Sequence, residues 1–70
     1  MREILLYMQL AQHFRDQILD GALKPGDALP AISQVREQTG RSRQTVGRAF
    51  RVLAGEGLIV HVAGRGYYVV

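Results

Sequence analysis

The chain has 70 residues, a formal net charge of +3 and no cysteine. A domain of this size buries only about 60% of the surface that its unfolded chain exposes, so little room is left for a catalytic cavity. Without cysteine there is neither a disulfide nor a thiolate zinc site, and apolar packing must stabilise the fold. No run approaches the roughly 20 apolar residues of a membrane span, and we expect a soluble, cytoplasmic chain.

The basic residues are concentrated in the second part of the sequence. Residues 1–40 carry four basic and five acidic side chains, a net charge of −1, whereas residues 41–70 carry five basic and one acidic side chain, a net charge of +4. A cationic region of this kind attracts polyanions, and a nucleic acid is the obvious one.

A first helix is predicted over about residues 4–20, because apolar residues recur there at three- and four-residue spacing. The residues of this stripe are Tyr7, Leu10, Ala11, Phe14 and Ile18. Its aromatic members are interpreted as core side chains, whereas His13 falls off the stripe and is expected to be exposed. Gly21 ends the helix, since a glycine just past the last periodic residue can adopt the left-handed conformation that closes it.

A turn and a second helix follow. Pro25 and Gly26 suit the central positions of a tight turn, because proline presets the first dihedral angle and glycine accepts a positive one at the second. Ala28 and Leu29 then predict a very short extended segment. Pro30 marks the entry to a second helix, where a missing N–H costs nothing. That helix is predicted to include Ile32, Val35, Gln38 and Thr39 and to end at Gly40.

The third predicted helix follows Ser42, whose hydroxyl can accept a hydrogen bond from an orphan backbone N–H of the first turn. The helix extends to about residue 54. One side is apolar, with Val46, Ala49, Phe50 and Leu53, and the others carry Gln44, Thr45, Arg48 and Arg51. Because no acidic residue occurs between Glu37 and Glu56, the exposed surface is cationic and rich in donors, which suits a nucleic acid. The alternative is a solvated helix face, but such faces usually mix both signs of charge.

The end of the chain predicts a β-hairpin, with strands over residues 58–62 and 67–70 and a turn over residues 63–66. Two helices separated by a turn at residues 40–41 form a helix-turn-helix. Followed by a hairpin, they define a winged helix-turn-helix, an α+β fold that is mainly α. One such domain accounts for residues 1–70.

The hairpin carries two further candidate side chains. Arg65 stands at the tip between Gly64 and Gly66, whose lack of a side chain allows close approach to a phosphate backbone or a minor groove. The alternative is that Arg65 only keeps the turn soluble. His61 is expected on a strand face rather than in a metal site, because the other histidine, His13, gives no ligand spacing.

Seven segments resemble, in order and spacing, the N-terminal domain of GntR-type bacterial transcription repressors, and they cover nearly the whole chain. Each segment is common by itself, and the specificity comes from the occurrence of all seven in order. They are Tyr7-x-Gln9, Ile18-Leu19-x-Gly21, Leu23-Lys24-Pro25-Gly26-Asp27-x-Leu29-Pro30, Ser42-Arg43-x-Thr45-Val46, Ala49-x-x-x-Leu53, Glu56-Gly57-Leu58-Ile59 and Gly64-Arg65-Gly66-Tyr67-x-Val69.

The resemblance implies a winged helix that binds a short palindromic operator in double-stranded DNA as a homodimer. Independently of the resemblance, we expect this dimer to be weak in solution without DNA. The third helix would enter the major groove, and the wing would meet the adjacent minor groove or backbone. A small-molecule effector would act only through a C-terminal domain that this sequence lacks, and no cofactor, metal or membrane is implied. DNA contacts in the family carry over to Ser42, Arg43, Gln44, Thr45, Gly64, Arg65 and Gly66.

This sequence departs from the family pattern at two places. Many members have Arg or Glu-Arg soon after the Leu-Pro pair, where this chain has Ile32 and Ser33, and many carry a DNA-contacting arginine at the position of Gly47. Ser33 can still meet a phosphate, and we expect Arg41 and Arg48 to compensate. The operator sequence therefore cannot be borrowed from a relative.

The candidate DNA-binding residues are Ser33, Arg41, Ser42, Arg43, Gln44, Thr45, Arg48, Gly64, Arg65 and Gly66. Within this set we expect Arg43 to bind a guanine or clamp a phosphate and Gln44 to contact a base edge. Two other function classes compete with DNA binding. A protein-docking module would use the arginines against an acidic protein surface. An enzyme is disfavoured, because the carboxylates are scattered and Ser42 has no paired histidine.

Overall fold

The computed structural model describes residues 2–70, with side chains from Leu5 onward. Its elements in chain order are α1 (Arg2–Leu19), α2 (Ile32–Thr39), α3 (Arg43–Gly55), β1 (Ile59–Val62) and β2 (Gly66–Val69). Three helices followed by a hairpin confirm the predicted winged helix-turn-helix, and only Met1 of the predicted domain lies outside the described residues. Within residues 2–70, no helix combines the length and apolar character needed to cross a membrane.

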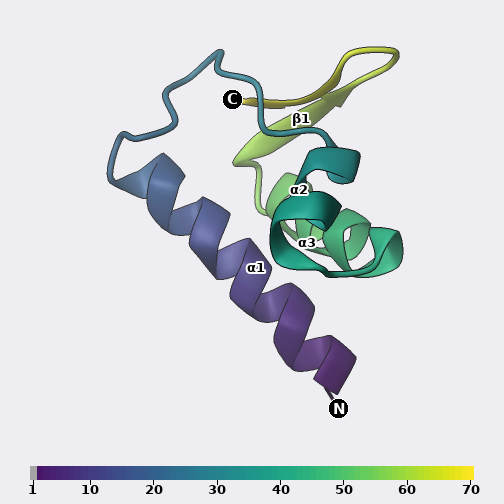
Figure 1. Ribbon diagram of the computed structural model, residues 1–70. Coiled ribbons are helices and arrows are strands. Elements are labelled where there is room, and N and C mark those ends of the chain that lie inside the picture. The colour runs from purple at the N-terminus through teal and green to yellow at the C-terminus, as the bar shows by residue number, and fades with distance from the viewer. Residues whose placement is uncertain (1) are drawn as a thin grey trace.

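Helix α3 is the central element of the fold. It packs against α1, α2 and β1, and Figure 1 shows α1 and the hairpin on different sides of it. Its apolar side contributes Val46, Phe50 and Leu53, which are three of the four largest fully buried side chains. The predicted core residues of α1 are confirmed in part: Phe14 is buried, whereas Tyr7 is partly buried at the edge of the core.

The short connection between α2 and α3 fixes where α3 begins. Gly40 ends α2 with φ of 71°, in the left-handed region, and its N–H donates to the carbonyl of Arg36 at 2.8 Å. Two residues later Ser42 caps α3, since its Oγ accepts from the backbone N–H of Thr45 at 3.1 Å. Both helix ends occur where the sequence predicted them.

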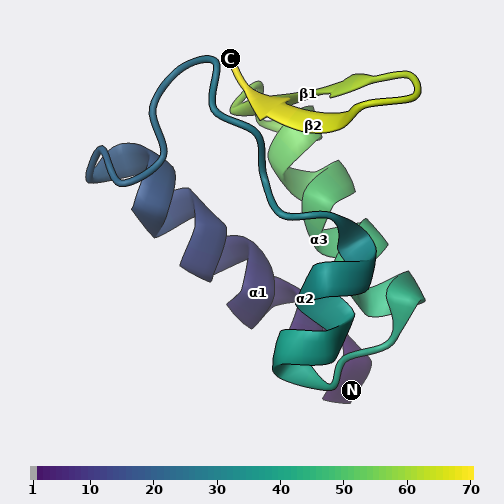
Figure 2. The ribbon, with the colours of Figure 1, turned by 45° about the horizontal axis from the view of Figure 1, so that its top comes forward.

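The hairpin is extended by a third segment of chain. β1 and β2 are antiparallel, with Ile59 opposite Val69. Residues 26–29 pair with the other edge of β2: the N–H of Val69 donates to the carbonyl of Asp27, and the N–H of Leu29 donates to the carbonyl of Tyr67, both at 2.9 Å. Figure 2 shows this segment passing beside the hairpin on its way to α2. The base of the wing is therefore anchored, and its turn projects beyond it.

Candidate nucleic-acid interface

The start of α3 and the wing line one groove with a volume of about 350 Å³. Arg43 contributes to it from the first turn of α3, and Arg65 and Gly66 contribute from the tip of the hairpin. Apart from His61, the remaining lining is apolar or aromatic and consists of Leu29, Pro30, Ala31, Ile32, Phe50 and Tyr67. Two cationic side chains that are far apart in sequence thus share one concave surface, so a single ligand can contact both.

The geometry of the wing tip depends on its two glycines. Gly64 has φ of 76° and Gly66 has φ of 109°, a region that side-chain-bearing residues rarely adopt. The turn is closed by a hydrogen bond from the N–H of Arg65 to the carbonyl of Val62 at 2.9 Å. The glycines therefore shape the turn that presents Arg65, which is exposed.

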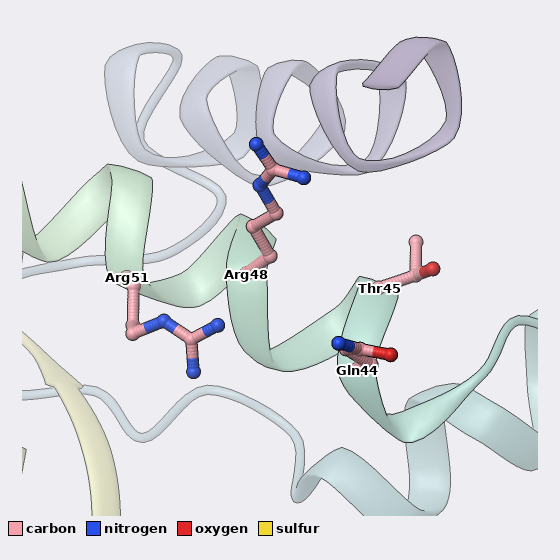
Figure 3. A pocket seen from close by; sticks show the side chains of 4 residues that line it. All are labelled: Gln44, Thr45, Arg48 and Arg51. Carbon is pink, nitrogen blue, oxygen red and sulfur yellow. The ribbon is translucent and has the colours of Figure 1, made fainter. Parts of the chain in front are cut away.

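A second, smaller hollow of about 240 Å³ lies on α3 itself, lined by Gln44, Thr45, Arg48 and Arg51. In Figure 3 the side chain of Arg48 extends toward α1, and that of Arg51 extends away from α1. The guanidinium carbon of Arg48 lies 4.3 Å from the centre of the Tyr7 ring on α1. Stacking on an aromatic face restrains a guanidinium but leaves the N–H donors at its edge available for a ligand.

The hydroxyl groups of Ser42 and Thr45 are hydrogen-bonded to each other, so they do not face a ligand independently. Their hydroxyl oxygens lie 2.9 Å apart in a hydrogen bond, and Thr45 is only 8% exposed. Because one hydroxyl proton is used within the pair, one remains for an outside acceptor. These two candidate DNA contacts therefore form one unit, which also caps α3.

Ser33 and Arg41 lie outside the groove shared by Arg43 and Arg65. Ser33 is exposed on α2, where it lines a shallow depression with Glu37 and Arg41. Arg41 also lines a depression against α1 that includes His13. Arg36 lines the same depression, but the carboxylate of Glu37 offsets one of its two arginines, so it attracts a phosphate less than the groove at the wing does.

The cationic surface is not neutralised by the protein's own acids. Within residues 5–70, the structure contains one ion pair, in which Arg15 of α1 contacts Glu56 just after α3 at 2.6 Å. None of the arginines between residues 41 and 65 takes part in it. Their charges are therefore available to an external anion.

The ion pair itself makes a small, pH-dependent contribution to stability. The pKa of Glu56 lies below its ordinary value, chiefly because Arg15 donates two side-chain hydrogen bonds to it, and the charge of Arg15 acts in the same direction. A lowered carboxyl pKa stabilises the fold above the ordinary value, and this contribution is lost as the pH falls through the lowered one. Because the side chains of Arg15 and Glu56 are 23% and 40% exposed, solvent screens the pair and the effect is small.

Gly47 provides a test of how closely α3 is packed, because the residue is buried although it carries no side chain. A Cβ at this position would meet only the flexible end of Arg51, at 3.6 Å. Because a glycine inside a helix costs about 1 kcal/mol relative to alanine, Gly47→Ala should raise the free energy of unfolding by about that amount. Urea denaturation followed by circular dichroism measures the change. Gly40→Ala is the matched control and should destabilise, since Gly40 has φ of 71°. A less stable Gly47→Ala would show that the neighbouring side chains cannot accommodate the added methyl group.

Two side chains of this surface go beyond the sequence-based prediction. The sequence places Arg51 on the cationic side of the third helix but outside the candidate DNA-binding set, and in the structure it lines the hollow with Gln44. Tyr7 was interpreted as a core residue, and its contact with Arg48 joins two helices. No local pattern in the sequence indicates a contact of that kind.

The three helices and the wing define a winged-helix domain. Its groove contains arginines but no carboxylate, which places the domain in the nucleic-acid-binding class. The chain belongs to the gntR family of bacterial regulatory proteins, whose family model matches residues 6–69. This confirms the resemblance found in the sequence.

Curated relatives and solved structures agree with this membership. The mannosyl-D-glycerate transport/metabolism system repressor MngR of Escherichia coli K12 is 45% identical over 64 residues, which are 91% of this chain and 27% of that protein. The repressor NagR of Bacillus subtilis is 39% identical over 66 residues, which are 94% of this chain and 27% of that protein. The chain thus spans about a quarter of the length of these two relatives. Their names confirm the expectation of a regulatory domain rather than an enzyme.

Among solved structures, the DNA-binding domain of AraR in complex with operator ORR3 superposes with a TM-score of 0.89 at 29% identity, covering 93% of this chain and 78% of that one. YtrA from Sulfolobus acidocaldarius, a GntR-family transcription factor, gives a TM-score of 0.82 at 41% identity and covers 90% of this chain and 66% of that one. The fold is therefore that of a DNA-binding domain of this family.

Proposed function

We propose that this chain is the DNA-binding part of a transcription repressor that recognises a palindromic operator as a dimer. The observation that carries the proposal is the groove in which Arg43 of α3 and Arg65 of the wing lie together without a carboxylate. Relatives named as repressors and an AraR domain bound to its operator support the same function. A DNA partner of this kind also favours the cytoplasm as its location.

The docking geometry follows from the shape of B-DNA. The major groove is about 12 Å wide and admits one helix. In the proposed complex the first turns of α3 enter this groove, where Arg43 and Gln44 reach base edges. The wing then carries Arg65 to the adjacent minor groove or backbone, while the Ser42–Thr45 pair and the N-terminus of α3 face a phosphate.

A dimer is proposed because one winged helix reads only a half-site, and a single module makes few base contacts. Leu5 and Met8 of α1 are 58% and 53% exposed and offer a small apolar contact. A contact of this size fits weak association that DNA binding completes. Any metabolite effector would act through a domain outside these 70 residues.

The salt dependence of binding to a random duplex of about 24 base pairs tests the proposal. Each phosphate contact should lower log K by about 0.9 per unit of log salt concentration, so several contacts give a steep slope. Fluorescence anisotropy between about 50 and 200 mM salt measures it. A subsequent selection from a random pool should enrich an inverted repeat. A protein-docking module would barely bind the duplex even at low salt, and enrichment of sites without inverted symmetry would contradict the dimer.

A further inference from the structure

His61 lies inside the groove that Arg43 and Arg65 share. It is exposed on β1, two residues after the buried Ile59, so both side chains project from the same face of the strand. Its partner across the hairpin is Tyr67, and their ring centres are 4.9 Å apart. The Tyr67 ring in turn packs against Phe50 of α3 at 5.1 Å. The imidazole is therefore held over the aromatic wall of the groove.

The charged and titratable groups around His61 are all cationic or neutral at neutral pH. Arg43 faces the groove from α3, Arg65 faces it from the wing turn, and Tyr67 from β2 is the other titratable side chain. The segment over residues 29–32 contributes no ionisable side chain, and no carboxylate lines this groove. A protonated His61 would thus be a third cation that the groove does not neutralise. A polyanion between Arg43 and Arg65 would neutralise it.

We propose that His61 is a proton-dependent DNA contact, whose imidazolium donates to a phosphate bound between Arg43 and Arg65. The proposal rests on the proposed DNA-binding function and adds a regulation of that site. Histidine ordinarily changes its charge between pH 5 and 8, whereas the phosphodiester stays ionised throughout that range. Because the complex binds the proton more tightly than the free domain does, DNA affinity rises as the pH falls.

The other histidine provides a matched control. His13 lies on α1, its ring packs edge-on against Phe14 at 5.2 Å, and it contacts the amide of Gln17 at 3.3 Å. It lines the depression with Arg41 and not the groove with Arg65. A pH effect that originates in the wing groove should therefore persist when His13 is replaced.

The experiment measures binding of the 70-residue chain to a random duplex of about 24 base pairs by anisotropy, at about pH 8 and pH 5.5 and fixed salt. Wild-type affinity should rise about tenfold on acidification, the value expected for one hydrogen bond to a charged group. His61→Gln should remain at the weaker level at both pH values, and His61→Arg should bind tightly at both. His13→Gln should follow the wild type.

Failure of the His61 proposal can be distinguished from failure of the proposed DNA-binding function. If the wild type binds the duplex but His61→Gln keeps the same pH dependence, or if His13→Gln abolishes it, His61 is not the proton-dependent contact. If the wild type binds no duplex at either pH at low salt, the proposed function itself fails, and the role of His61 fails with it.

Discussion

Replacing Arg43 by alanine should weaken binding to an operator selected from a random pool by about 5- to 150-fold and flatten the preference at the base that Arg43 contacts. A bidentate arginine–guanine pair is worth about 1–3 kcal/mol of discrimination, which corresponds to that range. Arg43 is exposed, begins α3 and lines the groove with Arg65, where no carboxylate competes for it. Titration at fixed salt against the selected duplex and a scrambled one measures both effects.

Two further variants separate recognition from charge. Arg43→Lys keeps the charge but lacks the planar fork, so it should retain binding to the scrambled duplex and lose preference for the selected one. Arg36→Ala removes an equally exposed arginine from α2, outside the groove, and should change sequence preference little. Unchanged affinity and preference in Arg43→Ala would remove this residue from the interface.

The elements of the fold could be predicted because their ends depend on local chemistry. Gly40 ends α2 since glycine tolerates a positive φ, and Ser42 begins α3 since its hydroxyl reaches an orphan N–H. The turn at Pro25 and Gly26 is likewise present, with Gly26 at φ of 89°. At α1, where the sequence offers no cap residue, the predicted start lies two residues later than the observed one.

The parts that sequence reasoning missed depend on contacts between elements. Ala28 and Leu29 were predicted to be extended, but their pairing with β2 as a third strand has no local signal. The stacking of Arg48 on Tyr7 likewise depends on how α1 crosses α3. The sequence predicts the ten candidate site residues as one set, but in the structure eight of them are divided among the wing groove, the hollow on α3 and the depression on α2. Ser42 and Gly64 line none of these three hollows.

Contacts between elements also predict which substitution destabilises the domain most. Phe50 is 1% exposed, and its ring lies edge-on between Phe14 of α1 at 5.4 Å and Tyr67 of β2 at 5.1 Å. It therefore joins the first helix, the third helix and the wing through one side chain. Such edge-to-face pairs add to the apolar area that each ring buries.

Phe50→Ala should lower the free energy of unfolding by about 3–5 kcal/mol. A domain of this size has a total stability of only about 4–10 kcal/mol, so this single substitution should remove a large share of it. Circular dichroism and urea denaturation measure this loss.

Val60→Ala, on the exposed face of β1, is the control, and its free energy of unfolding should stay close to that of the wild type. Cooperative melting of Phe50→Ala within a few degrees of the wild type would contradict the central role of this ring. In Phe50→Ala, DNA binding should fall in proportion to the loss of folded protein. Arg43→Ala should bind more weakly while it remains folded, because Arg43 is exposed and Phe50 forms the core beneath the groove.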